Sequence, residues 1–461
     1  MTLMEGLLIF FTIIFLYFII VIFLHKKGIL EKLNISLYGP ALLLRTTKGR
    51  NFLKKLASKE RFWKGFGNFG IALCFILMVL MVIVLIWQAW AVLGFTPAQK
   101  AAIPGPEIAL VLPGINPILP LEYIGYIMLA LVVAIITHEF SHGILTFAGK
   151  LKVKSLGILY LIVPIGAFVE PDEEQLKKTK TIKRMRVFAA GPLANFVVVV
   201  ISLFVLSFVF MSAVQPAAEG IGVLEVHEGT PADLIGIETG SIITGLNGTS
   251  FSELSTFRDR YNKYIEVINS TSANDTITIS YVQDRASYKK NITLFDRYDY
   301  FKSDFNKGKG YTGIYSMIGI NEHLEILKNP VSTDFPNGFL FFYVIPLLGY
   351  FEGYNPIVAP FTNSYQITGL LGALPSNVFW GIVNSLYWIF WLNLAVGLFN
   401  VLPMVPLDGG FLFNDGLGSI IKKVKKSISE EKKEKIVKNI SIVISLLILL
   451  SIIFPFIVKY I

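Results

Sequence analysis

The sequence predicts a polytopic α-helical membrane protein with about six transmembrane helices and an inserted extracytoplasmic α+β domain. Three observations support this fold class. The 461 residues are 54% hydrophobic and 16% charged, with a mean hydropathy of +0.62, which is far more apolar than an ordinary soluble protein. Several apolar stretches are long enough to cross a bilayer. Residues 220–296 interrupt them with a pattern typical of a soluble domain.

Six apolar stretches reach the roughly 20 helical residues that about 30 Å of hydrocarbon requires. They lie near residues 4–24, 70–93, 122–147, 187–211, 379–402 and 440–458. The first lacks a positive n-region and a small-residue cleavage site, so we expect a retained helix. The run 339–349 is apolar but has only 11 residues and contains Pro346, so we expect it at the interface or packed on the bundle.

Loop charges predict the orientation of these helices. Residues 25–67, 150–186 and 415–439 carry 11, 9 and 8 Lys or Arg, whereas residues 94–121 carry only Lys100. By the positive-inside rule the three basic loops face the cytoplasm, and the N-terminus and residues 212–378 lie outside. The predicted localisation is therefore multi-pass in the cell membrane.

Composition argues against two other classes of protein. The net charge of +9 comes from loops between helices rather than from one basic and aromatic surface, so nucleic-acid binding is not expected. The single cysteine, Cys74, lies inside an apolar run and supplies neither a disulfide framework nor a cysteine-based metal site.

The third predicted span contains an HExxH motif at residues 138–142. Positions i and i+4 share one face of a helix, so His138 and His142 can bind one Zn²⁺ while Glu139 addresses the attacking water. The pattern alone is weak. Its place inside a span strengthens it, because ionisable groups are costly there and are usually functional.

A zinc site needs at least a third protein ligand. The other three histidines lie in loops or in the outer region, which makes Asp408 the better candidate. Asp408 follows an apolar span that breaks at two prolines, and two glycines come after it. The sixteen residues from Glu122 to His138 correspond to about 24 Å of helix, so we expect the metal toward the cytoplasmic side. The fifth span brings Asp408 to a compatible level.

Four segments carry a family resemblance. They are HEFSH (138–142), PIGAFVE (164–170), GPLAN (191–195) and NVLPMVPLDGG (400–410). In order and spacing they resemble the site-2 protease family of intramembrane zinc metalloproteases. The resemblance covers roughly residues 120–215 and 379–412.

The resemblance implies one zinc ion per chain and an activity that hydrolyses peptide bonds within or near transmembrane segments of membrane proteins. Those membrane proteins and the lipid bilayer are the expected partners. The implied zinc ligands are His138, His142 and Asp408. Glu139 is the implied general base, and Asn400 is expected near the substrate carbonyl. A membrane-embedded hairpin that pairs with the unwound substrate is expected to contain Gly166, Ala167, Phe168 and Val169.

Residues 220–296 predict short strands and an amphipathic helix around residues 256–265, in an order that resembles a PDZ domain. Gly240-Ser241 stands where Gly-Asp is usual. A bound terminal carboxylate would be held by backbone amides beside an open strand edge. The candidate loop is Gly220, Ile221, Gly222 and Val223. A filter that excludes bulky ectodomains by size, with no peptide bound, is an equal alternative.

The expected organisation has six parts, and residues 300–378 have no readable role. The parts are residues 1–120, an N-terminal two-helix membrane region; 121–215, the first half of the catalytic core; 216–299, the PDZ-like domain; 300–378, an extracytoplasmic region; 379–412, the second half of the core; and 413–461, a basic cytoplasmic loop with the C-terminal helix.

Two other functional classes stay open: a catalytically inactive scaffold that presents the PDZ-like domain, and a metal transporter.

Overall fold

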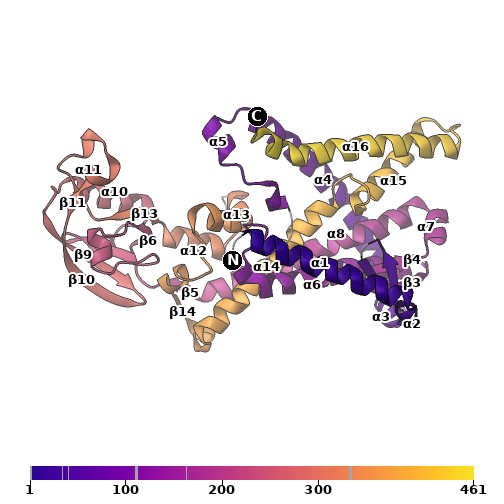
Figure 1. The fold of residues 1–461 in the computed structure, drawn as a ribbon, viewed down its shortest axis with the longest axis horizontal. Coiled ribbons are helices and arrows are strands. Elements are labelled where there is room, and N and C mark those ends of the chain that lie inside the picture. Colours follow the sequence, from indigo (N-terminus) through magenta and orange to yellow (C-terminus); the bar gives the residue numbers. More distant parts are fainter. Residues whose placement is uncertain are drawn as a thin grey trace. The chain divides into compact units, whose positions relative to one another are not determined.

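The computed structural model describes residues 3–33, 35–39, 41–109, 113–161, 163–331 and 335–460. The chain forms two compact units, which Figure 1 colours along the sequence. The first unit comprises residues 1–107, 128–199 and 391–461. The second comprises residues 108–127 and 200–390.

Five stretches in the described part of the chain are helical, long and apolar enough to cross a membrane. They coincide with five of the six predicted spans and confirm a multi-pass membrane protein. They are Glu60–Leu93 (α4), Leu121–Ala148 (with α6, Ile124–Ala148), Thr181–Ala213 (with α8, Thr181–Phe204), Ser376–Asn400 (α14) and Glu430–Val458 (α16).

The remaining predicted span, near residues 4–24, falls in α1 (Leu3–Lys26). Side chains 3–11, 13 and 14 of this helix lie outside the described residues. The apolar part that is described, Phe15–Lys26, is too short to count as a span by itself. A sixth membrane helix therefore stays a prediction.

An antiparallel sheet belongs to the first unit and has the strand order β1-β2-β3-β4. Its strands are β1 (Ile35–Tyr38), β2 (Ala41–Thr46), β3 (Val153–Leu161) and β4 (Val163–Pro171). Leu44 pairs with Ile158, and Leu156 pairs with Val169. The β3–β4 pair confirms the expected hairpin around residues 166–169, and β4 forms one edge of the sheet.

The helices of the first unit share buried apolar contacts. One cluster joins α4, α8 and α15 (Asp408–Val424) through Cys74, Ala189 and Leu412. In addition, α16 packs against both α4 and α15. The shorter helices of this unit are α2 (Ile29–Lys32), α3 (Arg50–Leu56), α5 (Pro97–Ala101) and α7 (Glu173–Lys178).

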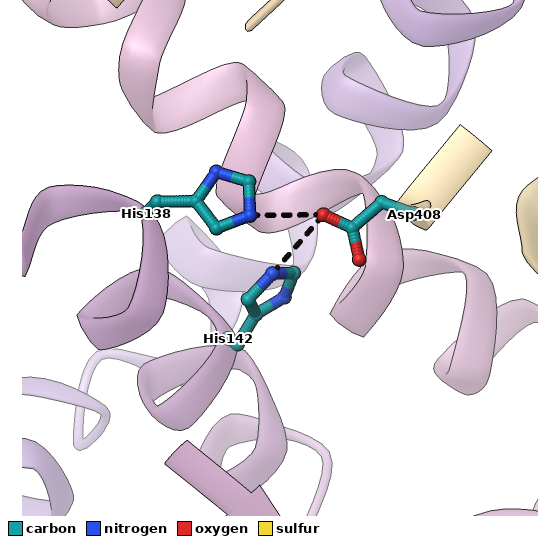
Figure 2. A group of neighbouring side chains, drawn as sticks. All are labelled: His138, His142 and Asp408. Carbon is teal, nitrogen blue, oxygen red and sulfur yellow. Dashed lines mark ion pairs between the residues drawn. The ribbon is translucent and has the colours of Figure 1, made fainter. Parts of the chain in front are cut away.

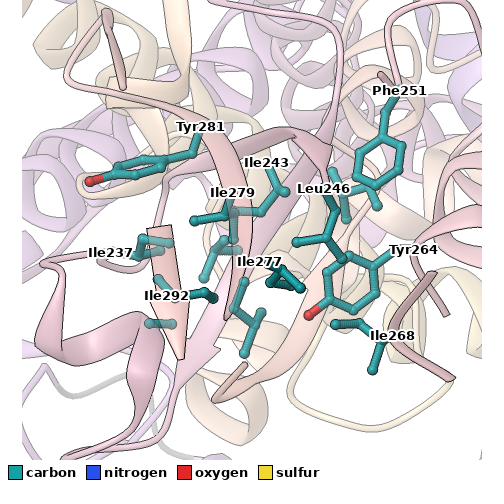
Figure 3. Packing of buried hydrophobic residues seen from close by; sticks show 14 of the residues in the cluster. Ile237, Ile243, Leu246, Phe251, Tyr264, Ile268, Ile277, Ile279, Tyr281 and Ile292 are labelled. Carbon is teal, nitrogen blue, oxygen red and sulfur yellow. The ribbon is translucent and has the colours of Figure 1, made fainter. Parts of the chain in front are cut away.

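The second unit contains the predicted α+β domain. Its main sheet has the order β10-β9-β7-β6-β13, and two helices accompany it, α9 (Pro231–Leu234) and α10 (Phe257–Asn269). On β9 every second side chain, Ile277, Ile279 and Tyr281, is buried, as expected for a strand with one face on a core. Figure 3 shows this core, in which Tyr264 and Ile268 of α10 meet the strand side chains. The strands are β6 (Ile221–Val226), β7 (Ile242–Leu246), β9 (Thr276–Gln283), β10 (Ala286–Thr293) and β13 (Ile314–Ile318).

This sheet continues beyond residue 299, where the sequence analysis ended the domain. Strand β13 pairs with β6, with Ile318 opposite Gly222. The predicted boundary is therefore too early for the sheet, because its last strand comes from a segment to which the sequence analysis gave no role. The short elements here are β8 (Thr249–Ser250), β11 (Phe295–Asp296), α11 (Arg297–Phe301) and β12 (Gly310–Tyr311).

The apolar run 339–349 forms most of α13 (Asn337–Glu352), which packs on α14. The hydroxyl of Tyr387 donates to the carbonyl of Phe342 at 2.9 Å, and Phe342 is fully buried. The expectation that this run packs on the bundle is confirmed. The second unit also contains α12 (Ile320–Lys328) and the pair of β5 (Val214–Pro216) with β14 (Tyr365–Ile367).

Candidate metal centre

Helix α6 places the two motif histidines on one face. Residues four apart in an α-helix lie one turn above each other, and the rings of His138 and His142 have their centroids 4.8 Å apart. Both residues are buried, at 8% and 9% exposure. A buried imidazole pair needs partners, since unpaired polar groups cost several kcal/mol (roughly 2–7) in an apolar environment.

The segment after α14 brings Asp408 to these rings. Two prolines, Pro403 and Pro406, end the helical path, and Asp408 is the first residue of α15. A Cβ at Gly409 would lie 2.3 Å from the carbonyl oxygen of Val401, so the residue after the aspartate must be glycine for this close approach. The sequence pattern of prolines and glycines thus fixes the position of the carboxylate.

Three potential ligand atoms converge, as Figure 2 shows. The Oδ2 atom of Asp408 lies 3.0 Å from Nε2 of His138 and 3.2 Å from Nε2 of His142. The ligand atoms of the three residues lie within 4.8 Å of one another. Two imidazole nitrogens and one carboxylate oxygen form the ligand set of a catalytic zinc site with one open position. Asp408 Oδ2 has no hydrogen-bond donor among the described residues, which fits an oxygen reserved for a cation.

A hydrogen bond fixes the tautomer of His142. Its Nδ1 lies 2.7 Å from the carbonyl oxygen of Val187 on α8. Because a carbonyl only accepts, Nδ1 carries the proton and donates, and Nε2 keeps a lone pair that faces Asp408. The ring is therefore oriented for metal binding by the backbone of the neighbouring helix.

Asn195, also on α8, supports His138 in the same way. It is fully buried, and its Nδ2 lies 3.4 Å from Nδ1 of His138, whereas its Oδ1 has no partner among the described residues. The oxygen and nitrogen of an asparagine amide are nearly equal in size, so the amide of Asn195 fits equally well when it is rotated by 180°. With the amide turned over, Nδ1–H of His138 donates to Oδ1, and Nε2 is again free for the metal.

Gly191 provides the space at the centre of the cluster. A Cβ at this position would lie 2.5 Å from Nε2 of both His138 and His142. Any side chain on Gly191 would therefore occupy the volume that a metal ion needs. Sequence reasoning missed Gly191, Val187 and Asn195 as parts of the site. The GPLAN segment was the signal, because it puts a small residue and a buried amide four positions apart on one face of a span.

Glu139 lies beside the cluster and contacts the edge strand β4. Its Oε2 accepts a hydrogen bond from the backbone N–H of Val169 at 2.9 Å. This bond places the proposed base next to the hairpin that contains Gly166, Ala167 and Phe168. The side chains of residues 161–165 lie outside the described residues.

Two other predicted site elements are Asn400 and the strand that follows Gly220. Asn400 ends α14, and its Nδ2 donates to the carbonyl of Val396 at 3.1 Å, so this amide is engaged within its own helix. The strand that contains Ile221, Gly222 and Val223 was expected to have an open edge. That expectation is wrong, because β6 lies between β7 and β13. In the described part of this sheet, β10 and β13 stand at the two ends, and β13 is the edge strand next to β6.

A buried His-His-Asp cluster with a glutamate next to the first histidine, on helices that can span a bilayer, defines a membrane metalloprotease centre. The family model for "Peptidase family M50" matches residues 126–448, and the chain therefore belongs to this family, the site-2 protease family.

Relatives are similar to the chain at low identity. The uncharacterized protein MJ0971 of Methanocaldococcus jannaschii is 26% identical over 94% of this chain and 96% of that protein. The zinc metalloprotease RasP of Shouchella clausii is 23% identical over 58% of each chain. The putative zinc metalloprotease LL2128 of Lactococcus lactis is 22% identical over 62% of this chain and 59% of its own length.

The chain also matches solved structures, one of which is a PDZ domain. The crystal structure of the PDZ domain of an SdrC-like protein from Listeria monocytogenes has 20% sequence identity and a TM-score of 0.17, and the match covers 23% of this chain and 93% of that one.

Proposed function

We propose that this M50 metalloprotease is an intramembrane zinc endopeptidase that hydrolyses peptide bonds within or near transmembrane segments of other membrane proteins. The observation that carries the proposal is the convergence of His138, His142 and Asp408, with Glu139 beside them, on helices apolar enough to lie in a bilayer. Ionisable groups in such helices are rare and usually functional.

Zinc bound there would lower the pKa of a water to about 7 and polarise the scissile carbonyl. The chain's own residues supply the rest. Glu139 accepts the proton from the attacking water and passes it to the leaving nitrogen. Val187 and Asn195 keep both imidazoles in the tautomer that has its lone pair toward the metal. Asn400 is proposed to stabilise the oxyanion, which requires its amide to leave the carbonyl of Val396.

Strand β4 is proposed to bind the unwound substrate. The N–H of Val169 points away from β3 toward Glu139, and strand geometry repeats every second residue. The N–H and C=O of Ala167 therefore point along the same edge. A substrate backbone paired with Ala167 would lie beside Glu139, with Gly166, Phe168 and Val169 as its neighbours on the strand.

Sidedness is part of the proposal. The basic loops favour a metal centre toward the cytoplasmic side of the cell membrane and a PDZ-like domain outside. In that position the domain either filters substrates by ectodomain size or binds a peptide. Peptide binding would use the free edge of β13 rather than the loop at Gly220, because β6 has strands on both sides.

Metal content and proteolysis of purified variants test the proposal. Glu139→Gln should keep one zinc per chain but lose activity about 10²–10⁴-fold, because the amide cannot accept the proton. Asp408→Ala and His138→Ala should lose both zinc and activity. Glu122→Gln, at an exposed position before α6, is the matched control and should change neither.

Two outcomes would refute the proposal. Full zinc in a folded Asp408→Ala protein would exclude Asp408 as the third ligand. Several weak metal sites per chain, instead of one tight site, would favour transport over proteolysis.

A further inference from the structure

A basic pocket lies where three helices of the first unit meet. It has a volume of about 220 Å³ and is lined by Lys64, Lys150, Lys183 and Arg186. Its apolar wall comes from Leu145 and Ala148, near the end of α6, which are both 2% exposed. The proposed proteolysis uses none of these residues.

The charges of this pocket are not balanced. Glu60 is the carboxylate that pairs with Lys64, at 2.9 Å, and with Lys150, at 3.6 Å. Lys183 donates to the carbonyl of Gly149 at 3.1 Å, and the Nε of Arg186 donates to Oδ1 of Asn68 at 2.8 Å. Neither Lys183 nor Arg186 has an acidic partner among the described residues. Four cations thus face one carboxylate, and the pocket is suited to an anion with several acceptor oxygens.

The surroundings favour a lipid as the source of that anion. The pocket lies at the ends of three stretches that can span a membrane: the start of α4, the end of α6 and the start of α8. Phe62 and Phe69 flank Lys64 on α4 and are 61% and 63% exposed, as expected for side chains that face lipid. The volume is below the roughly 300–1,000 Å³ of pockets for drug-sized ligands, and it suits a headgroup whose acyl chains stay outside.

We propose that this pocket binds the phosphate-bearing headgroup of an anionic phospholipid and thereby stabilises the contact between α6 and α8. The contact matters for the metal centre. Arg186 directly precedes Val187, whose carbonyl orients His142, and Leu145 follows His142 by three residues on α6. A phosphate held by Arg186 and Lys183 on α8 and by Lys150 just after α6 would join the two helices at this point.

The test measures lipid binding to the full-length protein in detergent by native mass spectrometry, with phosphatidylglycerol compared with phosphatidylcholine. The wild type should retain one phosphatidylglycerol in preference to phosphatidylcholine. The double substitution Lys183→Gln with Arg186→Gln should weaken that binding by about tenfold or more, because two cations near the headgroup are lost. Lys183→Arg with Arg186→Lys keeps both charges and should retain most of the affinity.

The matched control is Lys177→Gln with Lys178→Gln, which removes the same charge at the end of the neighbouring helix α7, from side chains that are 79% and 81% exposed. Equal loss of phosphatidylglycerol in this control would mean general surface attraction and would overturn the site. Unchanged binding in the Lys183 and Arg186 variant would also overturn it. Inorganic phosphate that displaces the lipid at millimolar concentration and raises the melting temperature equally would overturn the lipid source.

Discussion

At the residue scale, Gly191 decides whether a metal fits. A methyl group there would lie 2.5 Å from the Nε2 atoms of His138 and His142, within the space of the ion. We expect Gly191→Ala to weaken zinc binding by about tenfold or more while α8 stays folded, since alanine is a better helix former than glycine. Zinc content after dialysis against a chelator, with circular dichroism for helicity, measures this effect.

The control for this substitution is Gly125→Ala in α6. A Cβ at Gly125 meets no atom within 4 Å, so the change should leave the zinc content unaltered and stabilise helix α6 slightly. A Gly191→Ala protein that keeps full zinc would show that the metal does not lie between the two rings and α8.

The residues of the site differ in how far the sequence predicts them. The sequence predicts four of the site residues. His138, Glu139 and His142 have the spacing of a zinc-binding helix motif, and Asp408 lies where a helix breaks. Val187 acts through its backbone carbonyl, which any residue has, so no residue type indicates it. Asn195 lies in a segment that carries the family resemblance, but only the folded structure shows which side chain its amide meets.

At the scale of elements, an ion pair holds the helix that begins at Asp408. On α8, Nε of Arg184 donates to Oδ1 and Oδ2 of Asp415 at 3.0 and 2.8 Å, and its Nη2 donates to Oδ1 as well. Asp415 lies about two turns after Asp408 on α15. Its side chain is only 10% exposed, and that of Arg184 is 23% exposed. This pair therefore fixes α15 against the helix that orients His142.

We expect Arg184→Gln to destabilise the protein by about 2–3 kcal/mol, somewhat less than the loss of a fully buried partner, because it leaves the Asp415 carboxylate unpaired. Zinc occupancy should fall with it. Adding Asp415→Asn should recover part of the stability, since no charge is then left without a partner. Thermal unfolding in detergent and metal analysis measure both effects.

The control pair for the Arg184 prediction is Glu173 with Lys177, whose side chains are 75% and 79% exposed. Removal of one member there should change stability by less than about 1 kcal/mol. If the double variant of Arg184 and Asp415 were as unstable as the sum of the two single variants, the pair would have no coupling and this role would be disproved.

The elements also show where sequence reasoning ends. Long apolar runs predict helices directly, and alternation predicts the strands of the α+β domain. Strand partners are harder, because pairing joins segments that lie far apart in the chain. Strands β1 and β2 lie in a basic loop and pair with each other, and β2 also pairs with the distant β3. Strand β13 completes a sheet that begins at residue 221. Nothing in the sequence of these segments indicates which strand is the partner. For this reason the sequence analysis places the open edge beside β6 and not at β13.

At the scale of the whole molecule, exposed positions allow the predicted orientation to be tested. The α+β domain contains four N-x-S/T sequons, and their asparagines, at residues 247, 269, 274 and 291, are all exposed, which is compatible with an external domain. Cys74, the only cysteine, is fully buried, so the wild type should give no background with a thiol reagent.

Single cysteines should therefore report sidedness in intact cells. We expect Ser287→Cys, on the exposed strand β10, and Lys100→Cys to react with an impermeant maleimide from outside. Lys178→Cys and Lys425→Cys lie in two of the basic loops and should react only after permeabilisation, because the positive-inside rule places these loops in the cytoplasm. Labelling is read by gel shift, and each variant is checked for full zinc content.

If α1 does not span the membrane, the labelling of these four positions would be unchanged but the N-terminus would be cytoplasmic. An N-terminal tag that is accessible only after permeabilisation would show this. Reaction of Ser287→Cys only in permeabilised cells would reverse the orientation and place the α+β domain inside.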